Sequence, residues 1–282
     1  MSNYYYLVAG LPEVRSDDTK LTLHLQEIKQ TLNETLTKRD RATVSPVFEL
    51  YEAKNWLAYL RNSDAPLHPL GNSTADQFAE AVTLLKESEN PKITQIPPYF
   101  STFAYAFWEN KPLFEGLSWD DQLTTLFYQN AMKCKNKFIS QWFELNLNFN
   151  NLLAAYTCRK YGIDRQTAIL GDNDVAALLR INSARDFGVS DYFEAAPQVL
   201  RLSEDADLLD RERKIDLLKW QWIEDKTVFD YFSIEVVAAY LMKLEIIERW
   251  LPLRQESGTA VFRELINTLK SGVKFSEEVI NH

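Results

Sequence analysis

Apolar residues recur at intervals of three and four along most of the chain, and this spacing is typical of amphipathic helices. The clearest example lies between Asp17 and Thr37. Its apolar positions are Leu21, Leu25, Ile28, Leu32 and Leu36. Asp17 and Asp18 stand where acidic side chains favour the start of a helix, so the pattern predicts a helix over residues 17–37.

Turn-forming residues gather over residues 62–75, and Ser73 followed by Asp76 resembles a capping arrangement. We therefore expect a helix over residues 75–88. The next segment, residues 90–99, contains three prolines. Proline cannot donate a backbone hydrogen bond and restricts the residue before it, so we expect a loop or an extended crossing there.

A further break at residues 111–117 precedes Ser118. The Ser118 hydroxyl is expected to cap a helix that carries Asp120 and Asp121 in its first turn, where negative charge is favourable.

A very long apolar stripe then runs from Leu123 to about Tyr161. Its members are Phe127, Ala131, Cys134, Phe138, Trp142, Leu145, Phe149, Leu152 and Tyr156. A straight helix of some forty residues would extend about 60 Å, whereas a globule of this length has a radius of gyration of about 19 Å. The sequence therefore predicts one very long helix that bends, breaks or makes the molecule elongated.

The strongest candidate for a break in this helix is residues 145–151 (LNLNFNN), because Asn weakens helix propensity and the alternation imitates a strand. The helical spacing on both sides nevertheless favours helix through the segment. Gly162 is the expected end.

Shorter elements follow. Residues 164–202 read as short helices separated by Gly171, Gly188 and Pro197. Charged residues alternate with apolar ones over residues 204–223, which indicates another amphipathic helix. The last long helix is expected from Ser233 to about Trp250, closed by Pro252. The whole pattern predicts an all-α protein.

One short pattern recurs within the chain. Residues 152–156 (LLAAY) echo residues 236–240 (VVAAY), and Arg159 stands opposite Lys243. A weaker third copy lies at residues 55–59 (NWLAY), where Asn55 takes the place that Asn151 holds before its own apolar run. The echo suggests duplicated helical units, although the two intervals are unequal and repeat spacing is what normally secures such an interpretation.

Composition sets the outer limits. The chain has 282 residues, of which 46% are hydrophobic and 25% charged, so it can bury a full core as one large domain or two modest ones. No apolar run approaches the roughly 20 residues of a membrane helix. The start, MSNYYYLVAGLP, lacks the features of a signal peptide, so a cytoplasmic location is expected.

The net charge of -9 argues against nonspecific binding to nucleic acid. Two short basic segments, residues 38–41 (KRDR) and 133–137 (KCKNK), read as solvated faces. The two cysteines, Cys134 and Cys158, fall in apolar helical patterns and are expected to act as small hydrophobic residues.

Residues suited to chemistry are few. The three histidines, His24, His68 and His282, show no metal-ligand spacing, and no phosphate-binding glycine motif is present. Adjacent acids occur at residues 17–18, 120–121 and 277–278, but paired acids at helix starts are explained by the helix dipole. We therefore predict no catalytic, cofactor-binding or metal-binding residue, and no enzyme activity.

Aromatic residues are abundant, with seven Trp, thirteen Tyr and sixteen Phe. Most are expected in the core. The remainder would suit a protein interface, where Tyr and Trp are enriched.

Several of these segments also resemble a known family. FSIEVVAAYLMKLEIIERWLPL, residues 232–253, is similar to the terminal helix of the central-stalk component named C, or d, of V-type and archaeal A-type rotary ATPases. Asn151-Leu152, followed by residues 159–162 (RKYG), is similar to an internal pattern of that family. The opening YYYLVAGLP resembles its Tyr-x-Tyr start, and the whole chain resembles a bacterial group that opens with this string and is associated with V-type ATPase operons.

This resemblance implies a single all-helical, funnel-like domain over residues 1–282. It would contain three related units, roughly 1–110, 111–190 and 191–282. It implies a non-catalytic subunit of the central stalk that links the rotor shaft to the membrane ring and transmits torque for ion transport. The partners would be the central-shaft subunits and the rotor ring, and the chain would lie peripherally on the inner face of the membrane. Where that family has an Arg-hydrophobic-Arg motif, this chain has residues 9–12 (AGLP).

Two functions other than that of a central-stalk subunit are also considered. The first is a helical adaptor or regulatory protein unrelated to rotary ATPases. The second is a hydrolase with an acidic site, which would require a deep pocket holding two or more carboxylates with shifted titration.

Overall fold

The computed structural model describes residues 4–88, 91 and 93–255. Within these residues the chain forms twelve α-helices and one short 3-10 helix, and no strand is found there. The prediction of an all-α fold is confirmed. Across the same residues, no helix combines the length and the apolar character that crossing a membrane requires.

The connections between the elements differ in length, and the longest are residues 10–24, 62–74 and 182–195. In chain order they are α1 (Tyr5–Ala9), α2 (Leu25–Thr35), α3 (Lys38–Val44), α4 (Pro46–Arg61), α5 (Ala75–Glu87), α6 (Pro98–Trp108), α7 (Trp119–Ala131), α8 (Lys137–Tyr161), η1 (Arg165–Thr167), α9 (Asp174–Ile181), α10 (Ala196–Ser203), α11 (Leu208–Thr227) and α12 (Ile234–Gln255).

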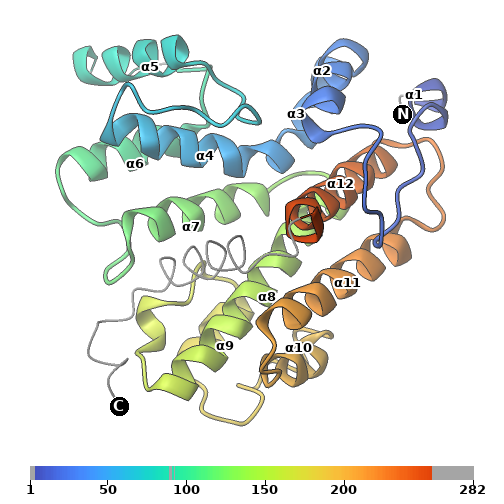
Figure 1. Ribbon diagram of the computed structural model, residues 1–282. Coiled ribbons are helices and arrows are strands. Elements are labelled where there is room, and N and C mark those ends of the chain that lie inside the picture. The colour runs from blue at the N-terminus through green and yellow to red at the C-terminus, as the bar shows by residue number, and fades with distance from the viewer. Residues whose placement is uncertain (1–3, 89–90, 92, 256–282) are drawn as a thin grey trace.

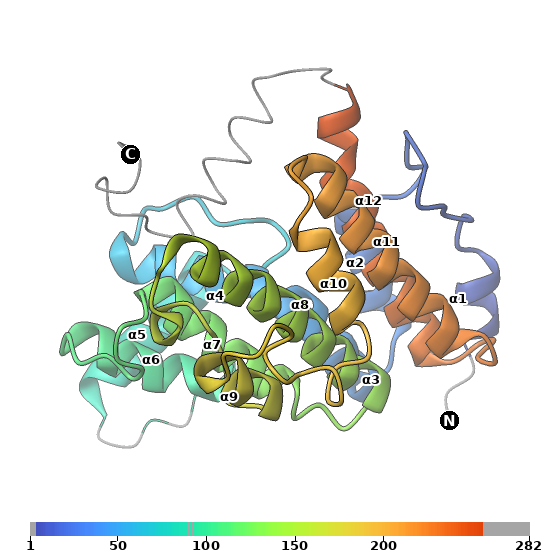
Figure 2. The ribbon, with the colours of Figure 1, turned by 90° about the horizontal axis from the view of Figure 1, so that it is seen from below.

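Helix α8 occupies the middle of the molecule (Figure 1) and packs against α7, α9, α10 and α12. Helix α4 packs against α3, α5, α6, α7 and α12. Helices α5 and α6 lie on one side of α8 and α11 on the other side in both views (Figure 2), and α12 packs against α4, α8 and α11. The junction of α4, α8, α11 and α12 is therefore the centre of the fold.

Three clusters of buried apolar side chains hold these helices together. The largest joins α2, α4, the first half of α8 and α12. A second lies between the second half of α8, α9 and α10, and a third between α4, α5 and α6. These clusters describe packing rather than ancestry, so the division into three related units near residues 110 and 190 stays a prediction.

The helix predicted from the apolar stripe over residues 123–161 does break, but not at residues 145–151. Helix α7 ends at Ala131 and α8 begins at Lys137, so the break falls at residues 132–136. There the side chain of Asn136 accepts a hydrogen bond from the backbone N–H of Ile139 and starts the new helix. Cys134 lies in this turn, so its predicted helical setting is wrong, whereas Cys158 is buried on α8 as expected.

Helix α8 runs unbroken through residues 145–151 because the asparagine side chains find partners. Asn146 donates to the carbonyl of Trp142, and Asn150 donates to the hydroxyl of Tyr128. Asn148 and Asn151 are buried and bonded to the loop that precedes α9. These bonds offset the low helix propensity of Asn.

The start of α2 differs from the prediction. Helix α2 begins at Leu25, where the Glu27 carboxylate accepts the backbone N–H of His24, while Asp18 accepts that of Arg15 in an earlier turn. The helix predicted over residues 17–37 is therefore shorter at its N-terminal end.

Helix α5 is capped by Thr74 and Gln77, which bond to each other's backbone N–H groups. The predicted cap of Ser73 with Asp76 is wrong, because the Ser73 N–H is already bonded to the carboxylate of Glu52.

The remaining boundaries mostly agree with the sequence. Ser118 caps α7 and Gly162 ends α8 in the left-handed conformation, with φ of 69°. Short helices follow, and then the two long ones. Pro252 lies inside α12 rather than closing it. The fixed φ of proline suits a helix, although its missing N–H costs one backbone hydrogen bond. The helix continues past it to Gln255.

Two loops are held by the same device, which we call an amide bridge. Asn55 on α4 bonds both backbone groups of His68, with N···O distances of 3.0 and 2.7 Å. Asn151 on α8 bonds both backbone groups of Leu170, at 2.8 and 2.9 Å. The weak sequence echo between residues 55–59 and 151–156 therefore corresponds to a shared local structure.

Candidate functional site

The residues with catalytic potential in the sequence are dispersed. His24 precedes α2, with its Nδ1 3.0 Å from the Glu248 carboxylate. His68 stacks on the ring of Tyr51, with the centroids 4.7 Å apart. His282 lies outside the described residues.

The acid pairs are also apart. Asp120 and Asp121 lie in the first turn of α7, as predicted. Residues 17–18 lie in a turn rather than in a helix, and residues 277–278 are outside the described range. Over residues 4–88, 91 and 93–255, no group of three or more His, Cys, Asp or Glu side chains could hold a metal ion.

The residues that carry the sequence resemblance have structural tasks. Asn151 forms its amide bridge, and Gly162 ends α8. Arg159 donates to the carbonyls of Ala184 and Arg185, and its guanidinium lies 3.5 Å from the ring centre of Phe187. These residues fix the α8–α9 connection and the loop beyond it.

Exposed aromatic side chains of the N-terminal segment and of the α11–α12 loop lie on the same surface of the molecule. We call it the aromatic face, and its members are Tyr5, Tyr6, Phe229, Tyr231 and Phe232. Tyr6 and Phe229 are 90% and 87% exposed. Exposure of this many large rings at one place is a recognised mark of an interaction site.

The aromatic face is positioned by contacts between distant parts of the chain. The backbone N–H of Tyr4 donates to the carbonyl of Phe232 at 3.0 Å. The rings of Tyr5 and Phe232 lie 4.6 Å apart. The hydroxyl of the buried Tyr4 donates to Asp40 at the start of α3. The face is therefore fixed to the helical body.

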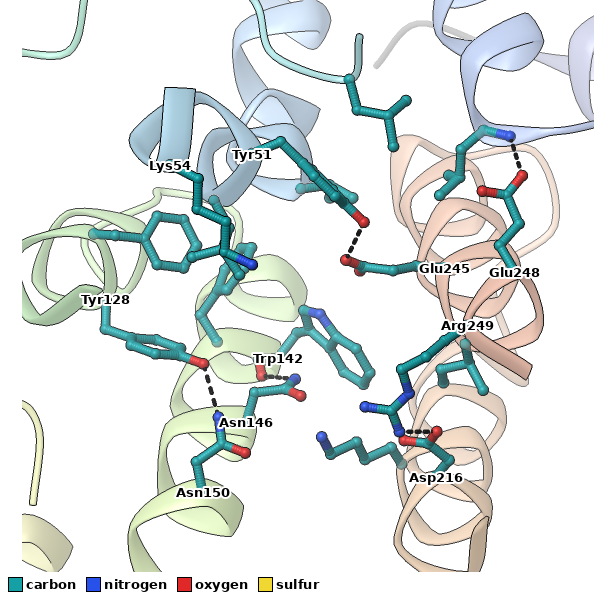
Figure 3. A pocket seen from close by; sticks show the side chains of 18 of the residues that line it. Tyr51, Lys54, Tyr128, Trp142, Asn146, Asn150, Asp216, Glu245, Glu248 and Arg249 are labelled. Carbon is teal, nitrogen blue, oxygen red and sulfur yellow. Dashed lines mark hydrogen bonds and ion pairs between the residues drawn. The ribbon is translucent and has the colours of Figure 1, made fainter. Parts of the chain in front are cut away.

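A cavity of about 500 Å³, which we call the polar cavity, lies at the junction of α4, α8, α11 and α12 (Figure 3). Its polar lining consists of Tyr51, Lys54, His68, Tyr128, Asn146, Asn150, Asp216, Lys219, Glu245, Glu248 and Arg249. Lys54 and Arg249 are exposed, so the cavity opens to solvent, whereas Asp216 and Lys219 are buried. Charged side chains are seldom buried unless they are paired.

Helices α4 and α8 present matching positions to the polar cavity. Lys54 and Asn150, each directly before its amide-bridge asparagine, both line it. Leu50 and Asn146, each five residues before that asparagine, line it as well. The cavity therefore lies between corresponding faces of the two helices.

Most charges of the polar cavity have protein partners. Arg249 donates to Asp216, which also accepts from the indole N–H of Trp250 at 2.7 Å. Glu248 accepts the backbone N–H of Leu25 at 2.7 Å. The hydroxyl of Tyr51 donates to Glu245 at 3.0 Å, as drawn in Figure 3.

Burial governs titration inside the polar cavity. It raises the pKa of the Glu245 carboxyl, and this is partly offset by the Tyr51 hydrogen bond and by the positive charges of Arg249, Lys219 and Lys54. Burial lowers the pKa of the Lys219 ammonium, against the opposing effect of Asp216.

The polar cavity was not predicted from the sequence. The available signal was the set of charged residues on helices whose other faces are apolar, such as Lys219 on α11 and Glu245 on α12. Such residues are ordinary on a solvated face, and only the packing of four helices brings them together.

Comparison with known proteins gives one match, to a protein family. No curated protein and no solved structure matches the chain. A family described as "Protein of unknown function (DUF2764)" matches residues 1–273. Since this match covers nearly the full length, the chain belongs to the DUF2764 family.

Proposed function

We propose that this protein is a non-catalytic subunit of the central stalk of a V-type ATPase. It links the rotor shaft to the membrane ring and transmits torque for ion transport. The observation that carries the proposal is the amide bridge, which involves Asn151 of the resembling segment and occurs a second time at Asn55. Recurrence of this device fits the related helical units that the resemblance implies.

The packing of the helices supports a mechanical role. A torque-transmitting subunit needs a body that resists deformation. Helices α4 and α8 are each tied to the loop that follows them by two side-chain hydrogen bonds, and α12 is packed against α2, α3, α4, α8 and α11. These ties restrain the connections, which are normally the most mobile parts of a helical protein.

The aromatic face is the surface that we assign to the protein partners. Interfaces are enriched in aromatic residues and depleted of charge at their centre. The face offers Tyr6, Phe229 and Tyr231 with most of their ring surface accessible. In this proposal the protein is cytoplasmic and peripheral, held at the inner face of the membrane through its contacts with the ATPase.

The test is a tagged pull-down from gently solubilised native membranes, with the retained proteins identified by mass spectrometry. We expect the rotor-ring and central-shaft subunits in stable proportion. Substitution of Phe229→Ser together with Tyr231→Ser should reduce their recovery at least tenfold. Tyr192→Ser is the matched control, because Tyr192 is 61% exposed and lies between α9 and α10.

Two results would contradict the proposal. The first is absence of the ATPase subunits from the pull-down while the ATPase is intact in the extract. The second is stable recovery of a different soluble complex, which would support the alternative of a helical adaptor.

The polar cavity is the observation that favours the other alternative, a hydrolase with an acidic site. It holds three carboxylates, and the pKa of one of them, Glu245, is raised by burial. Asp216, however, is already bonded to Arg249 and Trp250, and Glu248 to the start of α2. This arrangement suits the binding of a ligand better than proton transfer. A hydrolytic activity that is lost in Glu245→Gln would contradict this interpretation.

A further inference from the structure

The polar cavity contains a buried ammonium group without a hydrogen-bonding partner. Lys219 on α11 is only 8% exposed. Over the part of the chain that the structure describes, its ammonium forms no hydrogen bond and no close ion pair. It lies 5.5 Å from the ring centre of Phe149, and the carboxylates of Asp216, Glu212 and Glu245 act on it only at longer range. A buried charge without a hydrogen bond is costly to folding.

The lining carries three positive side chains, Lys54, Lys219 and Arg249, and three negative ones, Asp216, Glu245 and Glu248. Arg249 and Asp216 neutralise each other, and Glu248 is directed to the N-terminal end of α2. The remaining charged groups are two lysines, Lys54 and Lys219, and one carboxylate, Glu245.

The neutral groups of the polar cavity add both donors and acceptors. The Tyr128 oxygen accepts a hydrogen bond from Asn150, so its own proton can be donated to another group. Asn146 uses its amide nitrogen on the carbonyl of Trp142, which leaves its oxygen as an acceptor. Figure 3 shows Lys54, Tyr128, Asn146 and Glu245 directed toward one space from α4, α7, α8 and α12.

We propose that the polar cavity is a binding site for a small organic anion. A carboxylate or phosphate group of the ligand lies between Lys219 and Lys54 and accepts a hydrogen bond from Tyr128. A hydroxyl or amino group elsewhere on the ligand donates to Glu245. The cavity volume of about 500 Å³ falls within the usual range of small-molecule sites.

This assignment gives Lys219 a purpose that a structural role does not. The carboxylate of Asp216 offsets only part of the desolvation of the Lys219 ammonium, so a lysine that only filled space would gain little over an apolar residue of the same length. The proposal is independent of the proposed stalk function, since it concerns the interior junction of four helices and not the aromatic face.

The experiment measures thermal stability and binding heat for the full chain with inorganic phosphate, succinate and malate as separate probes. Phosphate and the two dicarboxylates distinguish the two kinds of anionic group. We expect at least one probe to raise the melting temperature, because a ligand that binds only the folded state stabilises it.

The decisive variant is Lys219→Met, with Lys226→Met as its matched control on the same helix. Lys226 is exposed and does not line the polar cavity. We expect Lys219→Met to weaken binding at least about tenfold, as loss of a charged hydrogen bond does, and to leave the ligand-free protein at least as stable as before. Lys226→Met should bind as the unaltered protein does.

Three results would overturn the proposal. One is the absence of any shift with all three probes, and another is an equal shift in Lys219→Met. The third is a large loss of stability in ligand-free Lys219→Met, which would make Lys219 a structural counter-charge to Glu245. If malate binds no better than succinate, the role of Glu245 as acceptor for a ligand hydroxyl is wrong.

Discussion

The α4–α5 region (residues 46–87) and the α8–α9 region (residues 137–181) have a similar local structure but differ in their charged side chains. In both, a buried asparagine on the first helix forms an amide bridge to the following loop. In both, a cation binds two carbonyls of that loop. Lys29 binds those of Leu70 and Gly71, and Arg180 those of Ile169 and Gly171.

The regions differ in where the charge lies. Three residues before the bridging asparagine, the α4–α5 region has Glu52, which accepts the N–H groups of Asn72 and Ser73. The same position in the α8–α9 region is Asn148, which accepts from the side chain of Asn173. Lys29 moreover comes from α2, outside its region, whereas Arg180 comes from α9. The first loop is therefore bound by charged groups from α2 and α4, whereas the cation that binds the second loop comes from within its own region.

The largest effect is expected from removal of the bridges. Asn55→Ala leaves the His68 N–H without its partner, while the His68 carbonyl still accepts from the Gly71 N–H; Asn151→Ala leaves both the N–H and the carbonyl of Leu170 without theirs. Each substitution should destabilise the protein by about 2–4 kcal/mol, which urea denaturation can measure. Asn146→Ala is the control, because Asn146 is partly exposed and bonds only within its own helix. A loss at Asn55 or Asn151 no larger than that of the control would contradict the shared role.

The next effect concerns the glycine of each loop. A Cβ at Gly71 would lie 2.1 Å from the Asn55 amide nitrogen, whereas one at Gly171 would lie 2.9 Å from a methyl carbon of Leu147. Gly71→Ala should therefore destabilise the protein by about 1–3 kcal/mol. The double variant with Asn55→Ala should be no less stable than Asn55→Ala alone.

The matching pair, Gly171→Ala with Asn151→Ala, should be close to additive, because the added methyl group meets a different residue. Two double-mutant cycles measure this difference. Equal coupling energies in both cycles would count against the distinction between the regions.

A smaller effect should follow removal of the cations. Lys29→Met and Arg180→Met each remove two hydrogen bonds to carbonyls near the surface, at a cost of about 1–2 kcal/mol. Because Lys29 joins α2 to the first loop, its loss should increase hydrogen exchange in α2 as well. Loss of Arg180 should increase exchange only within residues 137–181. Identical exchange patterns in the two variants would refute the proposed difference in coupling.

The smallest effect is a dependence on pH confined to the first region. Burial raises the pKa of Glu49, against the hydrogen bond donated by Asn130. A raised pKa in the folded state means that the folded protein holds the proton more tightly. The stability due to Glu49 is full below the ordinary glutamate pKa of about 4.3 and is lost as the pH rises through the raised value.

Glu49→Gln should therefore reduce the decline in stability above this pH. The corresponding position of the α8–α9 region is Leu145, which cannot titrate. Hydrogen exchange at two pH values on either side of the glutamate pKa can locate the effect. A decline that is unchanged in the variant would assign it to another carboxyl, of which Glu245 is the first candidate.

The helical periodicity was sufficient to predict the all-α fold and most long helices, because an apolar stripe records which face is buried. It could not place the break of the long stripe. The spacing from Ala131 to Phe138 continues across the turn at residues 132–136, so periodicity alone gives no sign of it. Helix propensity pointed to a break at residues 145–151. Asn148, Asn150 and Asn151 instead find hydrogen-bonding partners in other segments, which the sequence cannot show.

The polar cavity was beyond sequence reasoning for a related cause. Lys54 comes from α4, far along the chain from Lys219 and Glu245, which lie on the consecutive helices α11 and α12. Each is unremarkable in its own helix, since a charged residue between apolar ones normally faces water. The aromatic face was foreseen only as a surplus of rings, and its location depends on the contact between Tyr4 and Phe232.

That contact also has a consequence for synthesis on the ribosome. The N-terminal segment reaches its final position only when Phe232 is available, and α2 only when Glu248 is available. At the usual rates of translation, a nascent chain waits on the order of ten seconds or more between these events. During that interval Tyr4 and Tyr5 lack their native contacts with Phe232, so chaperones that recognise aromatic segments should meet this protein early in its production.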